Sequence, residues 1–237
     1  MEQNLARARG AIADAARGAG RDPASVTLVA VTKSVNLRTA LDLCRLGQLD
    51  LGENRVEALE QRARAFREHD LACRWHFVGH VQRNKARRVA EVADVVHSVD
   101  SEALIETLDR GAGNVGRSLG VYLQVKLHPE ATKSGLAPED LQSAVRAVTA
   151  APALHWLGLM TMAPLVTDDA ERAGHLAEQV FTELARLSAG CVARGAPGSG
   201  LSMGMSGDFE RAIRHGATCV RIGTRLFEGV AANEGAA

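Results

Sequence analysis

Short apolar runs alternate along the chain with longer segments that mix alanine, arginine, glutamate and leucine. Several of the short runs are almost continuously apolar, which is typical of parallel strands covered on both faces. The runs predicted as strands are Thr27–Lys33, Gln48–Asn54, Arg74–His80, Asp94–Val99, Val121–Leu127, Leu154–Met162, Gly200–Met205 and Cys219–Thr224. The alternation therefore predicts an α/β protein with a mainly parallel sheet.

The segments between these runs have the spacing of amphipathic helices. Apolar residues recur at helical intervals in Leu37–Leu46, Val56–His69, Pro138–Ala150 and near Ala170–Ser188. The third of these segments begins with proline and two acidic residues, which favour the first turn of a helix. A further helix is predicted over about residues 2–19, ahead of the first strand.

Eight strands, each followed by a helical segment, fit a (β/α)8 TIM barrel of about 250 residues. An open, doubly wound sheet is the alternative, because alternation alone does not show that the sheet closes. The count of eight favours the barrel, with an extra N-terminal helix. Since no linker or low-complexity segment divides the chain, we expect residues 1–237 to form a single domain.

Composition narrows the class of protein. The chain is 46% hydrophobic and 24% charged, and its 28 Lys+Arg balance 28 Asp+Glu, which argues against a disordered chain or a generally basic surface for nucleic acid or membrane. No apolar run approaches the roughly 20 residues of a membrane span, and the N-terminus does not have the pattern of a secretory signal. The cysteines lie far apart without metal-ligand spacing, which predicts reduced thiols, a cytoplasmic protein and no metal site: Cys44, Cys73, Cys191 and Cys219.

Lys33 stands at the end of the first predicted strand, where a barrel carries its functional side chains. It has two interpretations. The lysine could simply extend its charged end into water, or it could be a partly desolvated amine with a lowered pKa that forms a Schiff base with an aldehyde. A lone lysine does not decide between them.

The seventh and eighth strands end in small and hydroxyl-bearing residues, Ser202–Gly207 and Arg221–Thr224. Their glycines could serve only tight turns. However, small residues let backbone N–H groups approach an anion, and phosphate sites in barrels often use these two loops. A lysine on the first strand that faces a phosphate site on the last two suggests pyridoxal phosphate.

Seven motifs extend this picture over about residues 25–229: AVTK, GENRVEAL, WHFVGHVQRNK, TKSG, GLMTM, LSMGMSGDFERAIRHGATCVRIGT and LFEG. Their order resembles that of the pyridoxal phosphate homeostasis proteins, which are single-domain barrels similar to the N-terminal domain of alanine racemase. The resemblance implies that Lys33 holds pyridoxal 5′-phosphate through a reversible Schiff base. It also implies that Ser206, Gly223 and Thr224 bind the phosphate and that Arg221 faces the pyridine nitrogen.

The same resemblance implies a wider pocket. Asn54 and His76 match positions that line it, and Met160 and Met203 would pack near the ring. Lys133 matches a second lysine of the family, a candidate for loading the cofactor or handing it over.

This chain departs from the family pattern at four positions. His80 stands where proline is usual, Arg83 where a small polar residue is common, and Gly207 where an acidic residue is frequent. Lys126 replaces a usual asparagine in the fifth strand and would change the charge near the ring.

The expected contact from Arg221 bears on activity. A guanidinium is permanently charged and only donates hydrogen bonds, so it disfavours the protonated pyridinium that stabilises carbanions. Racemases of this barrel type use a tyrosine from a second domain, for which a chain ending at Ala237 is expected to leave no room. The only tyrosine, Tyr122, is expected to open a strand at the opposite end from the site.

We therefore expect no catalytic residue. The predicted function is that of a monomeric protein that holds, buffers and delivers pyridoxal phosphate, with apo forms of enzymes that use this cofactor as recipients. The alternative is a weak pyridoxal phosphate-dependent amino-acid racemase.

The remaining charged features are interpreted as structural. A solvated helix face is predicted for Arg62, Arg64 and Arg67 with Glu60 and Glu68. The one dense basic cluster is either a plain helix face or an attraction for the anionic cofactor: Arg83, Lys85, Arg87 and Arg88. Ordinary surface or packed histidines are expected at His97, His155, His175 and His215.

Overall fold

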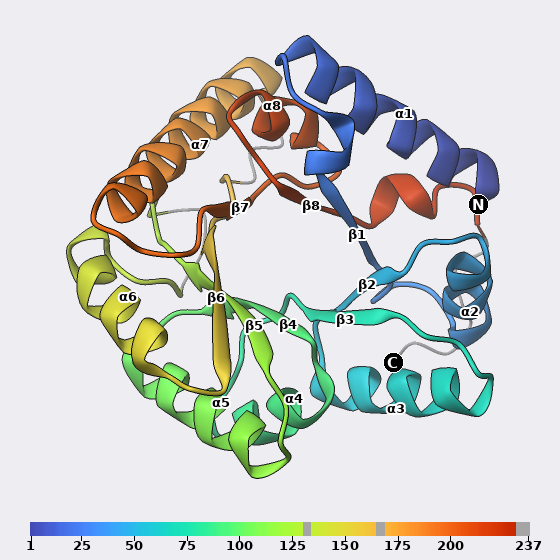
Figure 1. Ribbon diagram of the computed structural model, residues 1–237. Coiled ribbons are helices and arrows are strands. Elements are labelled where there is room, and N and C mark those ends of the chain that lie inside the picture. Colours follow the sequence, from blue (N-terminus) through green and yellow to red (C-terminus); the bar gives the residue numbers. More distant parts are fainter. Residues whose placement is uncertain (130–133, 165–168, 231–237) are drawn as a thin grey trace.

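The computed structural model describes residues 1–129, 134–164 and 169–230. Its strands run parallel in the order β1 to β8, and β8 pairs with β1 through the register Thr27↔Cys219 to Ala30↔Ile222. The sheet is therefore a closed barrel, and Figure 1 shows the helices arranged around it. The barrel predicted from the alternation is confirmed, and the open sheet is excluded.

The strands are β1 (Thr27–Val31), β2 (Asp50–Glu53), β3 (Arg74–Phe77), β4 (Val95–Val99), β5 (Leu119–Gln124), β6 (Leu154–Met160), β7 (Gly200–Ser202) and β8 (Cys219–Ile222). The helices are α1 (Glu2–Gly18), α2 (Leu37–Arg45), α3 (Val56–Glu68), α4 (Ala86–Val92), α5 (Glu102–Asn114), α6 (Leu141–Ala150), α7 (Ala170–Ala193) and α8 (Phe209–Arg214). Short 3₁₀ turns cover Pro23–Ser25, Arg83–Lys85, Pro138–Asp140 and Thr224–Leu226.

Strands β3 and β4 turn polar side chains into the barrel. Trp75 and Phe77 of β3 are buried in the main hydrophobic core, and Trp75 packs edge-on against Phe66 of α3 with ring centroids 5.0 Å apart. Alternation along the strand turns His76 to the other side, into the barrel, where it contacts His97 of β4. The main apolar core thus lies between strands and helices, and the space inside the barrel holds polar side chains beside a small apolar cluster of Val95, Tyr122 and Met160.

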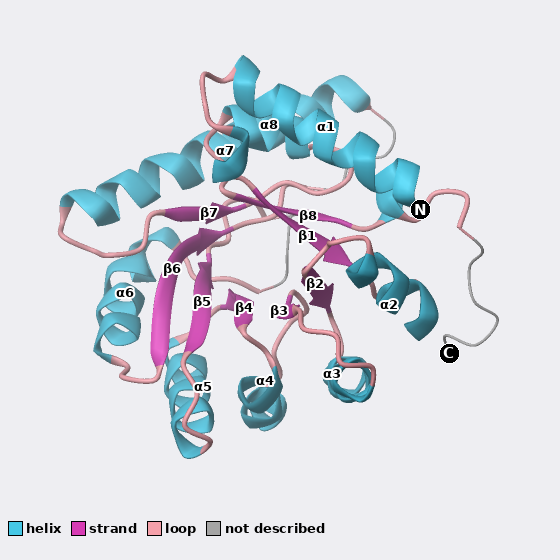
Figure 2. Cartoon of the chain, turned by 45° about the vertical axis from the view of Figure 1, so that its right-hand side comes forward, coloured by secondary structure: helices cyan, strands magenta, loops and turns pink. Residues whose placement is uncertain are grey.

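Helix α1 closes the ring of outer helices. It contacts α8 and the turn after β8, and Figures 1 and 2 both show α1 and α8 side by side. The Asn4 side chain donates to the carbonyls of Leu226 (3.1 Å) and Glu228 (2.8 Å). Among the described residues, β8 is followed by a 3₁₀ turn, so the expectation of a helix after every strand is wrong for β8. Helix α1 covers that side of the barrel instead.

Strand β5 begins earlier than predicted. Leu119 and Gly120 pair with Leu154 and His155 of β6, so the strand covers Leu119–Gln124 rather than Val121–Leu127. Tyr122 consequently lies in the middle of β5, and the expectation that it opens the strand is wrong. Glycine is unfavourable inside strands, so Gly120 hides the start of β5 in the sequence.

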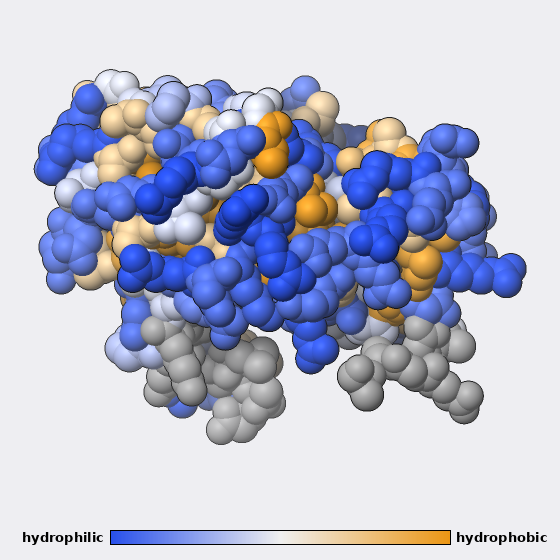
Figure 3. All heavy atoms as spheres, turned by 90° about the horizontal axis from the view of Figure 1, so that it is seen from below, coloured by the Kyte–Doolittle hydropathy of each residue, from blue (hydrophilic) through white to orange (hydrophobic). Residues whose placement is uncertain are grey.

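The basic cluster after β3 is part of a charged helix surface. Lys85 pairs with Glu57 at 2.9 Å and Arg88 with Glu60 at 2.6 Å, both across to α3, and Arg87 pairs with Glu91 on α4 at 2.8 Å. These pairs support the plain helix face over an attraction for an anion. The side of the molecule seen in Figure 3 is mainly hydrophilic, with apolar side chains in small separate areas.

Within the described part of the chain, no helix combines the length and the apolar character needed to cross a membrane.

Candidate functional site

Lys33 lies in the loop between β1 and α2, two residues beyond the end of β1, and its side chain is exposed. The loop ends where the Asn36 side chain caps α2 by accepting from the Thr39 N–H at 2.7 Å. Lys33 is thus an accessible amine at the carboxyl end of the barrel. Its exposure does not fit the partly desolvated amine, one of the two interpretations left open by the sequence.

The loop that carries Lys33 is held by a buried arginine. Arg62 of α3 donates to the carbonyls of Val35 (2.5 Å) and Thr32 (3.3 Å), and its Nε lies 3.0 Å from Oε1 of Glu53. Only 9% of Arg62 is exposed, so the prediction of a solvated position is wrong for Arg62, whereas Arg64 is exposed as expected. The 3.6-residue period places Arg62 on the side of α3 that faces the barrel.

Glu53, the last residue of β2, is fully buried beside this loop. Thr32 Oγ1 donates to its Oε1 at 2.5 Å, and its Oε2 has no hydrogen-bond partner among the described residues. Burial raises the pKa of this carboxyl, while the charges of Arg62 and Lys33 act in the opposite direction. The sequence places Glu53 beside Asn54 at the predicted end of the second strand but assigns it no role in the site.

Asn54 follows β2 at the same end of the barrel and is half-buried. The loop after β3 packs directly on its backbone, because a Cβ at Gly79 would lie only 2.2 Å from the Asn54 carbonyl oxygen. Glycine at 79 therefore allows the loops after β2 and β3 to meet.

The loops after β7 and β8 lie beside the Lys33 loop. Strand pairing places β7 next to β8 and β8 next to β1, with Ala30 opposite Ile222. Ser206 and Gly223 are half-buried and Thr224 is exposed. The structure therefore brings the three residues predicted to hold a phosphate to the same end of adjoining strands as Lys33.

Glycines shape the loop after β7 in two different ways. Gly204 has φ +95°, and a Cβ there would lie 2.7 Å from the Cβ of Ala212, so the turn into α8 requires glycine. An added Cβ at Gly207 meets nothing within 4 Å. The departure from the family pattern at Gly207 therefore falls at an open position and does not alter the packing.

Arg221 of β8 points into the barrel and is 5% exposed. Its guanidinium donates to Ser202 Oγ at 2.6 Å and to the carbonyl of Thr161 at 3.1 Å. Within the described ranges no carboxylate lies at ion-pair distance from it, and burial lowers its pKa. A guanidinium has more N–H donors than these two acceptors use, so Arg221 can also face an acceptor such as a ring nitrogen.

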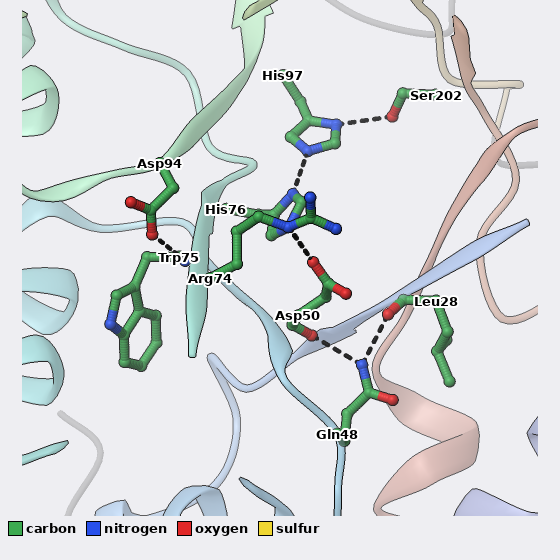
Figure 4. A network of polar contacts seen from close by, with 9 residues as sticks. All are labelled: Leu28, Gln48, Asp50, Arg74, Trp75, His76, Asp94, His97 and Ser202. Atoms are coloured by element: carbon green, nitrogen blue, oxygen red, sulfur yellow. Dashed lines mark hydrogen bonds and ion pairs between the residues drawn. The ribbon is translucent and has the colours of Figure 1, made fainter. Parts of the chain in front are cut away.

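His76 of β3 lies inside the barrel. It is 3% exposed, its Nε2 lies 2.8 Å from Oδ1 of Asp50, and its Nδ1 lies 2.8 Å from Nε2 of His97. Figure 4 shows His76 between these two partners. His76 is therefore connected to Arg221 only indirectly, through His97 and Ser202.

The remaining predicted residues are two methionines and two lysines on or after strands β5 to β7. Met160 is 1% exposed and packs with Val95 and Tyr122 in a small interior cluster, whereas Met203 is fully buried in the main hydrophobic core. Lys126 is half-buried two residues beyond β5. Lys133 lies outside the described residues.

Tyr122 contacts His97 inside the barrel and hydrogen-bonds with Thr218, the residue before β8. The two rings stack with centroids 4.8 Å apart and an interplanar angle of 23°. Tyr122 is 9% exposed, and burial raises the pKa of its phenol. A buried, neutral phenol in mid-strand is poorly suited to act as a base at the mouth of the barrel.

The donor set at this end of the barrel suits one kind of ligand. It combines an accessible primary amine, hydroxyls and small residues on neighbouring loops, and a buried guanidinium that only donates. An aldehyde, a phosphate and an aromatic nitrogen match these groups respectively. Among the residues that the structure describes, His, Cys, Asp and Glu do not gather into a group that could hold a metal ion.

Known proteins resemble this chain over most of its length. The family model described as alanine racemase, N-terminal domain, matches residues 4–230. A pyridoxal phosphate homeostasis protein of Pseudomonas aeruginosa is 42% identical over 230 residues, which cover 96% of this chain and 94% of that protein. The structure of PipY of Synechococcus elongatus with PLP bound is similar with a TM-score of 0.80 and 35% identity, over 95% of this chain and 99% of that one.

Alanine racemase of Clostridium difficile shares the fold at a greater distance. Its TM-score is 0.70 at 12% identity, and the match covers 95% of this chain but 56% of the racemase chain. The similarity to the racemase therefore concerns the barrel alone.

Proposed function

Because the chain belongs to the family of the pyridoxal phosphate homeostasis proteins, built on the alanine racemase N-terminal domain fold, we propose that it binds pyridoxal 5′-phosphate, holds it and delivers it. The observation that carries the proposal is the exposed Lys33 amine on a loop adjoining Ser206, Gly223 and Thr224. PipY, whose structure has been solved with PLP bound, is similar over nearly the whole chain.

Lys33 provides the attachment point in this proposal. The Lys33 Nζ would hold the cofactor through its aldehyde carbon, with loss of water, and water or another amine would release it. Arg62 and Glu53 fix the backbone of the loop, while the lysine side chain stays accessible to an incoming amine. A fixed loop with an accessible amine suits reversible holding.

Ser206, Gly223 and Thr224 are proposed to bind the phosphate, through the hydroxyls and the backbone N–H groups of the two loops. Arg221 is proposed to donate to the pyridine nitrogen. Since a guanidinium only donates hydrogen bonds, that contact would keep the nitrogen unprotonated.

An unprotonated ring withdraws electrons weakly, and Tyr122 is buried against His97. These two features support a protein without catalytic activity over the racemase. Its cargo would pass to apo enzymes that use the cofactor.

The other predicted residues take supporting roles. Asn54 and Met160 are proposed to shape the pocket directly and Met203 to support it from the hydrophobic core, with Lys126 at its edge and Lys133 as a second amine. His76 is proposed to act from behind Arg221, since Asp50 and His97 occupy both of its ring nitrogens. We further propose one domain, a monomer and a cytoplasmic location, for which the free thiols of Cys44, Cys73, Cys191 and Cys219 are suited.

The first experiment is the visible spectrum of the purified full chain with added pyridoxal phosphate, followed by borohydride reduction and peptide mass mapping. We expect a visible band and a reduced adduct on Lys33, both lost in Lys33→Ala. Lys85→Ala, which removes a lysine paired with Glu57 on the helix surface, should retain both. A reduced adduct on another lysine would overturn the assignment to Lys33.

A second experiment separates holding from catalysis. The loaded protein is incubated with a panel of L-amino acids in deuterated water, and we expect no catalytic exchange of the α-hydrogen. Turnover beyond one equivalent would favour the racemase.

A further inference from the structure

A continuous chain of hydrogen-bonded polar side chains crosses the interior of the barrel. It begins at Asp50, the first residue of β2, and ends at Arg221 of β8. Figure 4 shows most of the chain, from Asp50 through His76 and His97 to Ser202. We refer to these five residues as the relay.

The distances are short throughout. Asp50 Oδ1 to His76 Nε2 and His76 Nδ1 to His97 Nε2 are both 2.8 Å. His97 Nδ1 to Ser202 Oγ is 2.7 Å, and Ser202 Oγ to Arg221 Nη1 is 2.6 Å. Each link is therefore a hydrogen bond of normal or short length.

The two ends of the relay determine the direction of every hydrogen bond. An ionised Asp50 can only accept, so His76 Nε2 carries a proton, and a neutral His76 then accepts at Nδ1. His97 must accordingly donate from Nε2 and accept at Nδ1, where the Ser202 hydroxyl donates. The oxygen of Ser202 then accepts from Arg221, which can only donate. Every donor along the chain points from Arg221 toward Asp50.

The surroundings of both imidazoles favour their neutral forms. His97 is fully buried, stacks on Tyr122 and has the charge of Arg221 nearby, and burial holds its pKa well below its usual range. Burial also lowers the pKa of His76, while Asp50 acts in the opposite direction. Burial would raise the pKa of Asp50, but the hydrogen bonds from His76 and Arg74 outweigh it and keep the carboxyl ionised.

We propose that Ser202, His97 and His76 are positioning residues that hold the Arg221 guanidinium toward the ring nitrogen of the cofactor and connect it to the negative charge of Asp50. The last step, the contact with the cofactor, rests on the proposed function. The relay adds to the charge of Asp208, which acts on the buried guanidinium without lying at ion-pair distance from it. It also makes the cofactor end of the barrel sensitive to a charge at the opposite end.

Asp50 is well placed for that role. Its side chain is 21% exposed at the amino end of the barrel, where it also pairs with Arg74 and lines a cavity of about 400 Å³ with Arg9 and Gln48. The buried Gln48 side chain donates to the Asp50 carbonyl at 2.9 Å and to the Leu28 carbonyl at 2.7 Å. The backbone that carries Asp50 is therefore held firmly below the histidines.

The first test needs no cofactor. Long-range ¹⁵N–¹H NMR of the full chain reports which ring nitrogen of each histidine carries the proton. We expect His76 and His97 both to be neutral with the proton on Nε2, and Ser202→Ala to change the signals of His97. Protons on Nδ1, or a doubly protonated ring at neutral pH, would overturn the direction of the relay.

The second test compares two aspartates at the amino end of the barrel. Asp50→Asn removes the charge but keeps the shape and an acceptor for His76. Asp94→Asn is the matched control, since Asp94 pairs with Arg117 at 2.6 Å and accepts from the Trp75 N–H at 2.7 Å outside the relay. The readouts are the position of the visible band and the dissociation constant of pyridoxal phosphate.

We expect Asp50→Asn and Ser202→Ala to shift the band and to weaken binding by about fivefold or more, while Asp94→Asn matches the parent protein. Equal behaviour of Asp50→Asn and Asp94→Asn would overturn the positioning role. If the parent protein forms no visible band, the proposed function fails instead, and the NMR experiment still tests the relay on its own.

Discussion

Two buried arginines serve the candidate site, and their partners differ. Arg62 pairs with the Glu53 carboxylate and holds three backbone carbonyls of the Lys33 loop. Arg221 instead donates to a hydroxyl and a carbonyl inside the barrel. Arg62 neutralises a buried carboxylate, so its loss should lower stability. Arg221 has N–H donors left for a ligand, so its loss should mainly affect binding.

We expect Arg62→Ala to lower the free energy of unfolding by about 3–5 kcal/mol, because it leaves the Glu53 carboxyl buried without its partner. Urea denaturation measures this change. Arg64→Ala, an exposed position on the same helix, should change the free energy by less than about 0.5 kcal/mol.

The double variant Glu53→Gln, Arg62→Met separates the ion pair from the packing. It should be more stable than Arg62→Ala alone, since it removes the unpaired charge as well. A double variant less stable than the single one would contradict the buried ion pair as the cause.

At the scale of elements, strand β6 depends on one glycine. The register between β5 and β6 shifts between Val121 and Tyr122, and Gly158, opposite Tyr122, has φ +147°. A Cβ at this position would lie 1.9 Å from the carbonyl oxygen of Gly200 in β7. Both the backbone conformation and the pairing with β7 therefore require glycine.

We expect Gly158→Ala to destabilise the barrel by more than about 3 kcal/mol or to prevent folding. Gly10→Ala is the matched comparison, because an added Cβ in α1 meets nothing within 4 Å. That variant should be more stable by roughly 0.5–1 kcal/mol. Thermal unfolding followed by circular dichroism distinguishes them, and similar melting temperatures for the two variants would contradict the steric argument.

The sequence predicted the elements well and their ends less well. Apolar, β-branched runs located each strand, but several predicted strands ran past the observed ends, as at Lys33 and Asn54, because the residue pattern does not show where strand pairing stops and the chain turns. Tertiary pairing alone placed Tyr122 in mid-strand.

The positions of Lys33 and Arg221 relative to the strand ends could be predicted from the spacing of the apolar runs. Arg62 and His97 could not, because their importance depends on partners distant in sequence. Arg62 binds carbonyls of the loop before α2, and His97 contacts Ser202. A charged helix position or a histidine in a strand gives no sign of such partners by itself.

At the scale of the whole molecule, the polar barrel interior links stability to pH. His76 and His97 have lowered pKa values in the folded protein, whereas an unfolded histidine titrates near about 6.5. The folded state therefore binds fewer protons than the unfolded state below that pH. The stability from keeping these histidines neutral is complete above about pH 6.5 and decreases as the pH falls. Buried carboxyls with raised pKa values act in the opposite direction: Glu53, Asp100 and Asp208.

Because these carboxyls act against the histidines, the test compares slopes between variants. The free energy of unfolding is measured by urea denaturation from pH 7.5 to 5.5, a range set on both sides of about 6.5, for the parent protein, His97→Gln and His155→Gln. Below about pH 6.5, the slope of the free energy of unfolding against pH should be smaller in His97→Gln than in the parent protein by about 1.4 kcal/mol per pH unit. This is the value for one proton that only the unfolded state binds. His155 is exposed, so its replacement should leave the slope unchanged. Equal slopes for the two variants would mean that His97 takes up a proton inside the folded barrel, which would also reverse the direction of hydrogen bonding toward Arg221.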